Sequence, residues 1–168
     1  EVSAKHAAII CCTASNPTYV RIDKGAHEKI YERLDCDVGI NQISNKSKIK
    51  IISTGYMTHK MLELSREIDI SVDVIDFYRL KPLNTKAIKD ILRHSDFIIT
   101  VEENTSIGSI GSMMCEILVD SGIKTRLKRF SLEDKQELEF GSRDWLIENS
   151  GLKKQEIKQI IEEAYNEL

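Results

Sequence analysis

From Lys48 onward, strand patterns and helix patterns alternate along the sequence. Short runs rich in β-branched and aromatic residues predict strands at residues 49–54, 72–77, 97–101 and 126–130. Between the first three strands, apolar residues recur at helical spacing: Met57, Met61, Leu64 and Ile68, then Ala87, Ile88, Ile91 and Leu92. Such alternation is typical of right-handed βαβ units. We therefore expect an α/β fold with a mostly parallel, twisted sheet of about five strands flanked by helices.

The later helices are marked by residues that favour helix ends. Asn84 is a good N-cap for the helix that follows it, because its side chain can accept a hydrogen bond from a free backbone N–H. Residues 113–119 predict a third helix that ends near Gly122. Residues 144–168 predict two further helices separated by Gly151, and the second of these is amphipathic.

The N-terminal segment has one helix pattern and one strand pattern. Residues 3–15 are rich in alanine and small apolar residues and predict a helix, which Asn16 and Pro17 interrupt. The β-branched residues at 18–22 predict a short strand. A single strand cannot form a sheet, because its backbone groups need neighbouring strands as hydrogen-bond partners. We therefore expect residues 1–25 to be the end of a domain that begins upstream.

A different pattern separates this segment from the alternating region. Residues 26–47 have mixed polarity and weak periodicity, which is typical of a linker. An edge strand is predicted near the end of the linker, at residues 38–43. Residues 48–168 contain the regular strands and helices, and we expect them to form one domain with its own core.

Charge and apolar content exclude two classes of partner. The 168 residues include 24 Lys and Arg against 27 Asp and Glu, a formal net charge of −3, whereas nucleic-acid binding requires a basic excess. No apolar run approaches the roughly 18–20 residues that span a bilayer, and the first residues lack a signal-peptide pattern. We therefore expect a soluble cytoplasmic protein that binds neither nucleic acid nor a membrane.

The spacing of cysteine and histidine predicts neither disulfides nor a metal site. The four cysteines form no CxxC pair, so we expect them to be reduced: Cys11, Cys12, Cys36 and Cys115. The four histidines are too far apart in sequence to place two ligands on one helix face: His6, His27, His59 and His94. We expect no metal site made by this chain alone.

Several longer motifs occur in a fixed order. They are ISTG at 52–55, DFYRLKPLN at 76–84, VEENTSIGSIGSM at 101–113 and EFGSRDWLIENSGL at 139–152. Together they resemble the C-terminal domain of the transketolase-like thiamine-diphosphate enzymes, and most of all the 1-deoxy-D-xylulose-5-phosphate synthases. The similarity covers about residues 38–165. A further motif, PTYVRIDKG at 17–25, resembles the last strand of the pyrimidine-binding domain in the same enzymes, so residues 1–25 are expected to be the tail of that domain.

The resemblance implies a parent enzyme that uses thiamine diphosphate and Mg²⁺ to transfer two-carbon units between carbonyl compounds. The cofactor supplies most of this chemistry. In the family, the activating carboxylate and the metal–diphosphate ligands come from parts N-terminal to the residues present here. We therefore expect no catalytic, cofactor-binding or metal-binding residue in this chain, which alone should be inactive and should act in structure and assembly.

The same resemblance predicts the partners. They are the N-terminal cofactor-binding domains, or a separate subunit that carries them, and a second copy of the chain in a homo-oligomer such as the family's dimer. The sugar-phosphate substrate is the expected ligand of the full enzyme.

Two basic residues are the candidate ligands of the substrate phosphate. In the resembling enzymes the strand that matches residues 17–25 supplies a basic side chain to this phosphate, and the matching positions here are Arg21 and Lys24. Arginine suits the role because its planar donors can bind a phosphate in bidentate fashion. Lys24 departs from the family's usual arginine and offers only a point charge. An interdomain or surface ion pair is the alternative role for Arg21.

Other conspicuous residues have structural interpretations. Glu102 and Glu103 could form an acid/base pair, but consecutive strand residues face opposite sides, which favours capping or interdomain hydrogen bonds. The glycines of 108–112 lack nucleotide-binding spacing and are expected to let the turn enter a helix closely. Phe140 stands where the family commonly has histidine. Trp145 is expected to pack at the start of the tail helices.

Two alternative functions remain open. One is a free-standing, non-catalytic module that binds a small anion or a partner at the carboxyl edge of the sheet, near Thr54, Gly55, Arg79 and residues 108–112. The other is the C-terminal domain of a 2-oxoacid dehydrogenase β subunit, which shares the fold and the cofactor. The residues present do not decide between acceptor chemistries.

Overall fold

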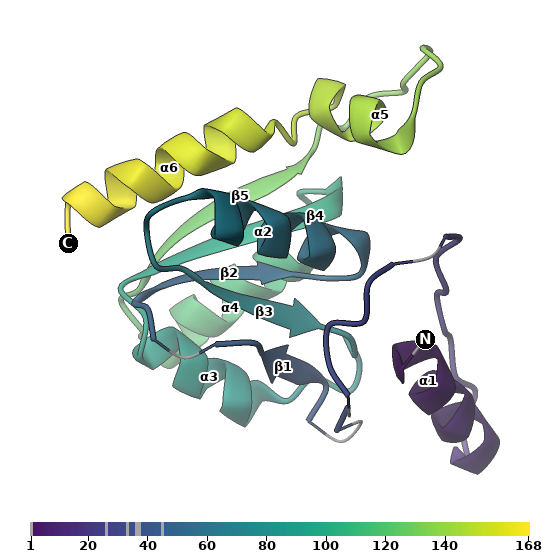
Figure 1. Ribbon diagram of the computed structural model, residues 1–168. Helices are drawn as coiled ribbons and strands as arrows, with labels where there is room; N and C mark the ends of the chain where they lie inside the picture. The colour runs from purple at the N-terminus through teal and green to yellow at the C-terminus, as the bar shows by residue number, and fades with distance from the viewer. Residues whose placement is uncertain (1, 26, 33, 36–37, 45) are drawn as a thin grey trace.

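The structure is a computed structural model that describes residues 2–25, 27–32, 34–35, 38–44 and 46–168. Within these residues, helices and strands alternate from β2 to β5 (Figure 1). In chain order the elements are α1 (Val2–Thr13), β1 (Ile40–Gln42), β2 (Ile49–Ser53), α2 (Tyr56–Glu67), β3 (Asp73–Phe77), α3 (Thr85–Arg93), β4 (Phe97–Thr105), α4 (Ile110–Ser121), β5 (Arg126–Leu132), α5 (Arg143–Asn149) and α6 (Lys154–Asn166).

The strands form a five-stranded sheet in the order β1-β3-β2-β4-β5. β2, β3, β4 and β5 pair in parallel, and β1 pairs with β3 in antiparallel orientation at one edge. In the central strand, Ile51 lies opposite Val74 of β3 and Ile99 of β4. The predicted fold class is confirmed, including a mostly parallel sheet of five strands.

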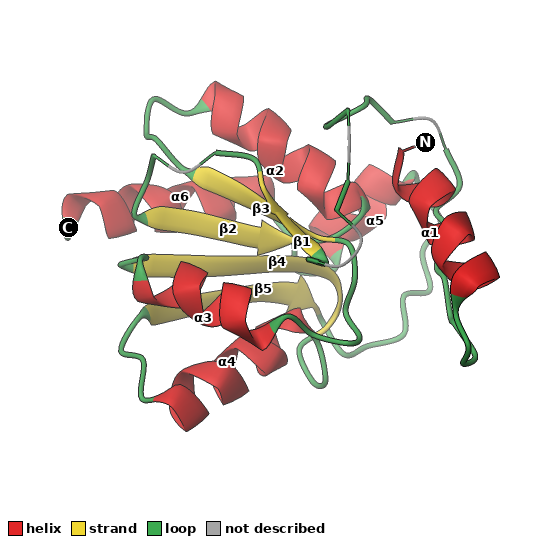
Figure 2. Ribbon diagram, turned by 90° about the horizontal axis from the view of Figure 1, so that it is seen from below, coloured by secondary structure: helices red, strands yellow, loops and turns green. Residues whose placement is uncertain are grey.

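Helices cover both faces of the sheet, so the central strands are buried on both sides. Figure 2 shows α2 and α6 on one side of the sheet and α3 and α4 on the other. Side chains alternate along β2: Ile51 belongs to the core under α2 and α6, and Ile52 belongs to the core under α3 and α4. This double burial is typical of parallel sheets, and it buries every residue of β2 and β3, the charged Lys50 and Asp73 included.

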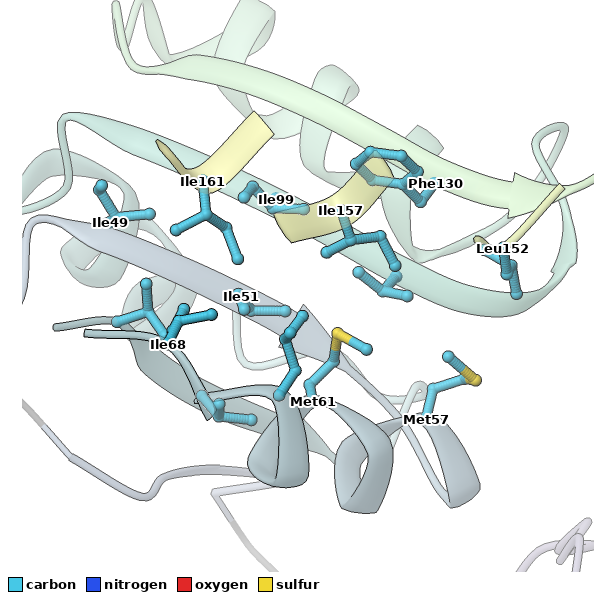
Figure 3. Packing of buried hydrophobic residues seen from close by; sticks show 14 of the residues in the cluster. Ile49, Ile51, Met57, Met61, Ile68, Ile99, Phe130, Leu152, Ile157 and Ile161 are labelled. Atoms are coloured by element: carbon cyan, nitrogen blue, oxygen red, sulfur yellow. The ribbon is translucent and has the colours of Figure 1, made fainter. Parts of the chain in front are cut away.

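The first core is built from the predicted helical face of α2 and the amphipathic face of α6. In the close view, Met61 of α2 lies beside Ile51 of β2, and Met57 lies farther along the helix on the side of Leu152 (Figure 3). Ile157 and Ile161 of α6 pack over the same sheet face, and both are almost fully buried. The spacing of three or four residues in each helix is what places these side chains on one face.

The helix ends follow the predicted capping chemistry in part. The Asn84 side chain accepts a hydrogen bond from the Ala87 N–H at 3.1 Å, so the predicted N-cap of α3 is confirmed. α4 ends at Gly122, whose φ of 61° is a left-handed conformation that glycine adopts without a Cβ clash. α4 begins at Ile110, three residues before the predicted start, because the Ser109 side chain caps it.

Two strand predictions differ from the structure. Residues 18–22 form no strand, and Tyr19 is 89% exposed. The segment has high strand propensity, but no neighbouring strand is present to pair with its backbone. β4 continues to Thr105, past the predicted end at residue 101, because β5 keeps pairing with it across an irregularity between Glu102 and Thr105. Among the described residues, no helix is long and apolar enough to cross a membrane.

Candidate functional site

The candidate site is the edge of the sheet where the parallel strands β2, β3 and β4 end. In open α/β sheets this is where ligands bind, because strand ends and helix N-termini leave polar backbone groups free. Gly55, with φ of 57°, makes the turn from β2 into α2. Figure 1 shows the segment between α1 and β1 passing the carboxyl ends of β2 and β3.

Glu102 occupies the N-terminus of α4. One carboxylate oxygen accepts from the Ile110 N–H at 2.8 Å and the other from the Gly111 N–H at 2.8 Å, and the residue is 3% exposed. A helix N-terminus is a general anion-binding site. Here the chain's own carboxylate fills that site, which confirms the capping interpretation of Glu102.

The loop before α4 depends on Gly111 for a close approach to the sheet. A Cβ at Gly111 would lie 2.7 Å from Cδ of Arg129 and 2.8 Å from Oγ1 of Thr100, closer than side chains normally pack. The prediction that a glycine lets this turn enter the helix closely is confirmed at this position. Gly108 instead serves the turn through its φ of 71°.

Glu103 points to the opposite face and binds Arg143 of α5. Nε of Arg143 lies 3.0 Å from Oε1 of Glu103, and Nη2 lies 2.5 Å from Oε2, so the contact is bidentate. Nη1 of the same guanidinium binds Oδ2 of Asp23 at 2.6 Å. The guanidinium carbon also lies 4.2 Å from the ring centroid of Tyr56, a cation–π contact. One side chain therefore joins the N-terminal segment, α2, β4 and α5.

These contacts fix the charge states around Arg143. The hydrogen bond from Arg143 holds the pKa of Asp23 below its ordinary value. The hydrogen bond to Glu103 raises the pKa of Arg143, with Asp23 adding to the effect, so the guanidinium stays charged. In the sequence, the only signal for Arg143 is its place in the motif EFGSRDWLIENSGL at 139–152, and this motif alone does not distinguish it as a functional residue.

A second network lies at the end of β3, around the buried Asp76. The Tyr31 hydroxyl donates to Oδ2 of Asp76, and the Thr58 hydroxyl donates to Oδ1 at 2.8 Å. The Ser53 hydroxyl in turn donates to Thr58 at 3.1 Å. Burial raises the pKa of Asp76, although the two hydroxyl donors act in the opposite direction. Burial and the adjacent Asp76 raise the pKa of Tyr31, so the phenol remains a donor.

Replacing Asp76 by asparagine is expected to stabilise the protein at neutral pH. A carboxyl group whose pKa is raised by folding binds its proton more tightly in the native state, so its charged form costs native stability as the pH rises above about 4. The variant removes this cost and keeps an acceptor for Tyr31. We expect the free energy of unfolding in urea to rise by about 1 kcal/mol at pH 8 and to change little at pH 4.

The matched control for this experiment is Asp69→Asn, which changes an exposed carboxylate and should leave the unfolding free energy nearly unchanged at both pH values. Equal destabilisation of Asp76→Asn at pH 4 and pH 8 would show that the Asp76 carboxylate acts through hydrogen bonds alone.

Aromatic rings join the N-terminal segment to α2. The His27 ring centroid lies 4.9 Å from that of His59 and 5.3 Å from that of Tyr56. Burial, with a smaller contribution from His27, lowers the pKa of His59, which favours a neutral ring in this contact. Next to these rings, Lys60 and Tyr56 both donate to Asp144 of α5.

The candidate phosphate ligands lie on the exposed N-terminal segment. Arg21 lines a hollow of about 350 Å³ together with His27, Tyr31 and His59. Lys24 is also exposed, and the side chain of the intervening Asp23 binds Arg143. The structure brings Arg21 near the linker residues, and the phosphate-binding role of both residues stays a prediction.

Two aromatic residues of the C-terminal motif differ in exposure. Phe140, at the position where histidine is common, is fully exposed. Trp145 is 39% exposed, and its ring lies against Gly141, where an added Cβ would be 2.4 Å from Cε3 of the indole. The indole of Trp145 therefore lies against the loop that precedes α5, but the residue stays more exposed than the predicted packing implies.

The structure offers no obvious metal ligands in its described part. Among the described residues, no group of three or more His, Cys, Asp or Glu side chains could hold a metal ion. Cys11, Cys12 and Cys115 are free thiols, and the prediction for Cys36 lies outside the described residues.

Comparisons with known proteins agree on one family. The family model described as "Transketolase, C-terminal domain" matches residues 39–157. A 1-deoxy-D-xylulose-5-phosphate synthase of Frankia casuarinae is 27% identical over 157 residues, covering 88% of this chain and 24% of that protein. A putative transketolase C-terminal section of Methanocaldococcus jannaschii is 30% identical over 159 residues, covering 90% of this chain and 49% of that protein.

A solved structure shares the fold. It is described as a split-gene transketolase in an inactive β4 tetramer, and it matches 82% of this chain and 46% of that chain with a TM-score of 0.69 and 22% identity. The chain thus spans about a quarter to a half of the length of these relatives. The two sequence matches are longer than the family model's residues 39–157 and extend into the N-terminal segment.

Proposed function

Because the chain belongs to the transketolase C-terminal domain family, we propose that it is the C-terminal portion of a thiamine-diphosphate-dependent transketolase-type enzyme. The parent activity is that of a 1-deoxy-D-xylulose-5-phosphate synthase or a transketolase, acting in the cytoplasm. In this proposal the chain serves structure and assembly, and catalysis takes place where the cofactor and its Mg²⁺ are held, on domains or a subunit N-terminal to these residues.

The observation that carries this proposal is that both glutamates near the carboxyl end of β4, Glu102 and Glu103, bind groups of the chain itself. Glu102 has both oxygens on backbone amides of α4, and Glu103 has both oxygens on Arg143. A carboxylate that activates the aminopyrimidine of thiamine diphosphate must be free to bind it. These residues therefore do not fit the cofactor, and the described part of the chain holds no metal-ligand cluster for its diphosphate.

The domain organisation follows from the same proposal. Residues 1–25 belong to the pyrimidine-binding domain, residues 26–47 are the linker, and residues 48–168 are the C-terminal domain. The extension of the sequence matches beyond residues 39–157 supports this division, since relatives carry similar sequence on the N-terminal side. The parent assembles as a homo-oligomer, and Arg21 and Lys24 bind the phosphate of its sugar-phosphate substrate.

A free-standing anion-binding module is the weaker hypothesis. It needs the backbone amides at the start of α4 to be available to a ligand. The Ile110 and Gly111 amides are instead bound by Glu102, which is buried and already supplies the negative charge that this helix end favours. The start of α4 therefore gives that module no free backbone amide at residues 110 and 111.

A thermal-shift titration tests where the cofactor binds. Thiamine diphosphate with Mg²⁺ is added to the chain, and the full-length 1-deoxy-D-xylulose-5-phosphate synthase of Thermotoga maritima, a relative 31% identical over 123 residues, serves as the positive control. Ligand at a hundredfold excess over its Kd raises the Tm by about 5 °C or more in a protein of this size. We expect no shift for this chain. A shift of that size would place a cofactor site within it and overturn the proposal.

A further inference from the structure

The residues that follow Lys24 form a strap across the carboxyl edge of the sheet. We use this name for residues 23–25 and 27–31. Three of its side chains are anchored: Asp23 on Arg143 of α5, His27 on the rings of α2, and Tyr31 on Asp76 of β3. The strap therefore contacts three elements that are far apart in the sequence, while most of its other described residues are exposed.

Arg143 holds the first of these anchors. Its side chain is 31% exposed, against 36% for Asp23 and 24% for Glu103, so both ion pairs are partly shielded from solvent. The guanidinium uses one edge for Glu103, another donor for Asp23 and one face for Tyr56. A planar group with five donors can make these contacts at once, whereas an ammonium group cannot.

We propose that Arg143 is a positioning residue for the phosphate-binding segment: by holding Asp23 it fixes Arg21 and Lys24 beside the carboxyl edge. This inference rests on the proposed phosphate-binding role of those two residues. Asp23 lies between them in sequence, so the ion pair acts directly on the backbone that carries both basic side chains.

The hollow beside Arg21 gives the positioning a second consequence. The hollow is lined by His27 and Tyr31 of the strap, among others. The contacts of these two residues with α2 and β3 fix their positions in the lining. Without Arg143, the carboxylates of Asp23 and Glu103 would share a small region with no cation between them. Repulsion would then favour release of Asp23, and the geometry of the hollow around Arg21 would be lost.

Hydrogen exchange measures the strap directly. In Arg143→Gln, the backbone amide of Lys24, which donates to Oδ1 of Asp23 at 3.0 Å, should exchange roughly fivefold faster, the size expected for loss of one partly shielded ion pair, while amides of β2 and β4 stay protected. Arg143→Lys should restore part of the protection. Glu103→Gln is the matched control at the same site, because it leaves the pair between Asp23 and Arg143 in place and should keep the strap protected.

A second control removes an arginine elsewhere. Arg126 of β5 forms an exposed ion pair with Glu167 at the far end of the sheet, so Arg126→Gln should leave strap exchange unchanged. If Arg143→Gln also leaves it unchanged, Arg143 does not hold the strap and the inference is wrong.

Binding of inorganic phosphate separates a positioning residue from a ligand. Titration followed by NMR at the amides of Arg21 and Lys24 should give weak binding to the wild-type chain, roughly fivefold weaker binding in Arg143→Gln, and partial recovery in Arg143→Lys. Arg21→Gln should weaken phosphate binding by roughly tenfold or more, because Lys24 remains as the second ligand, and should leave strap exchange unchanged. Weaker phosphate binding without a change in strap exchange would identify Arg21 as a ligand, whereas loss of a positioning residue such as Arg143 should change both measurements.

The outcomes separate the two proposals. Faster strap exchange with unchanged phosphate affinity in Arg143→Gln would overturn the positioning role. Absence of phosphate binding in the wild-type chain, together with faster strap exchange in Arg143→Gln, would overturn the assignment of Arg21 and Lys24 as ligands and would confine Arg143 to holding the strap.

Discussion

Replacing Lys50 by methionine is expected to lower the free energy of unfolding by about 3–5 kcal/mol. Lys50 and Asp73 form an ion pair at 2.8 Å, with side chains 2% and 1% exposed. Methionine fills most of the volume of lysine but leaves the Asp73 carboxylate buried without its cation. The remaining donors to Asp73 are the Ser44 hydroxyl and the backbone amides of Lys46 and Ser47, which cannot neutralise its charge.

The matched control is Lys48→Met, in the same stretch of chain. The Lys48 side chain is exposed, and its ammonium group donates to the His94 carbonyl at 3.4 Å, so its replacement should cost less than about 0.5 kcal/mol. Urea unfolding of both variants measures the difference. A loss below about 1 kcal/mol in Lys50→Met would show that the hydrogen bonds to Asp73 satisfy the carboxylate without Lys50.

The pH dependence of the same variant tests the mechanism. Burial alone would raise the pKa of Asp73, but hydrogen bonds from Lys50, Ser44 and the backbone outweigh it and hold the pKa below its ordinary value. A lowered carboxyl pKa contributes stability that is present above about pH 4 and is lost as the pH falls through the native value. Removing Lys50 weakens that contribution, so the gap between wild type and Lys50→Met should narrow below about pH 4.

Replacing Glu102 by alanine should be the next most damaging change, with an expected loss of about 2–4 kcal/mol. The substitution removes two charge-assisted hydrogen bonds and leaves the Ile110 and Gly111 amides at the start of α4 without an acceptor. Both amides lie in a buried environment, where an unsatisfied donor is costly. Chemical denaturation measures the loss.

Two further variants make this result specific. Glu102→Gln keeps one carbonyl oxygen as an acceptor and should lose about half as much stability. Glu116→Ala changes an exposed glutamate on the same helix and should be nearly neutral. If Glu102→Ala and Glu116→Ala have similar effects, the cap of α4 does not stabilise the domain.

The sheet and its helices could be predicted because their signal is local. The apolar spacing of Met57 and Met61 places them on one helix face whatever that helix packs against. The alternation of a strand also sufficed to separate Glu102 from Glu103, and the structure sends the first to α4 and the second to Arg143. The sequence alone therefore predicted the face of the helix or strand on which each of these side chains lies.

The hydrogen-bond and ion-pair partners of polar side chains could not be predicted, because these partners lie on segments that are distant in the sequence. Tyr31 binds Asp76 across 45 positions, and Asp23 binds Arg143 across 120. No spacing rule connects such residues until the fold brings them together. The strand expected at residues 18–22 fails for the same reason, since strand propensity is realised only when a neighbouring strand supplies hydrogen bonds.

The three anchors of the strap also determine how this domain would respond to tension. A pull on the chain at residue 22 reaches the pair between Asp23 and Arg143 first, then the rings around His27, and then the hydrogen bond between Tyr31 and Asp76. Beyond Tyr31, the carbonyl of Asp35 is held by the Tyr78 hydroxyl, and only after this contact does the load reach the three residues of β1, which pair with β3. A pull on this end of the chain would thus break separate weak contacts one after another before it reached the edge strand of the sheet.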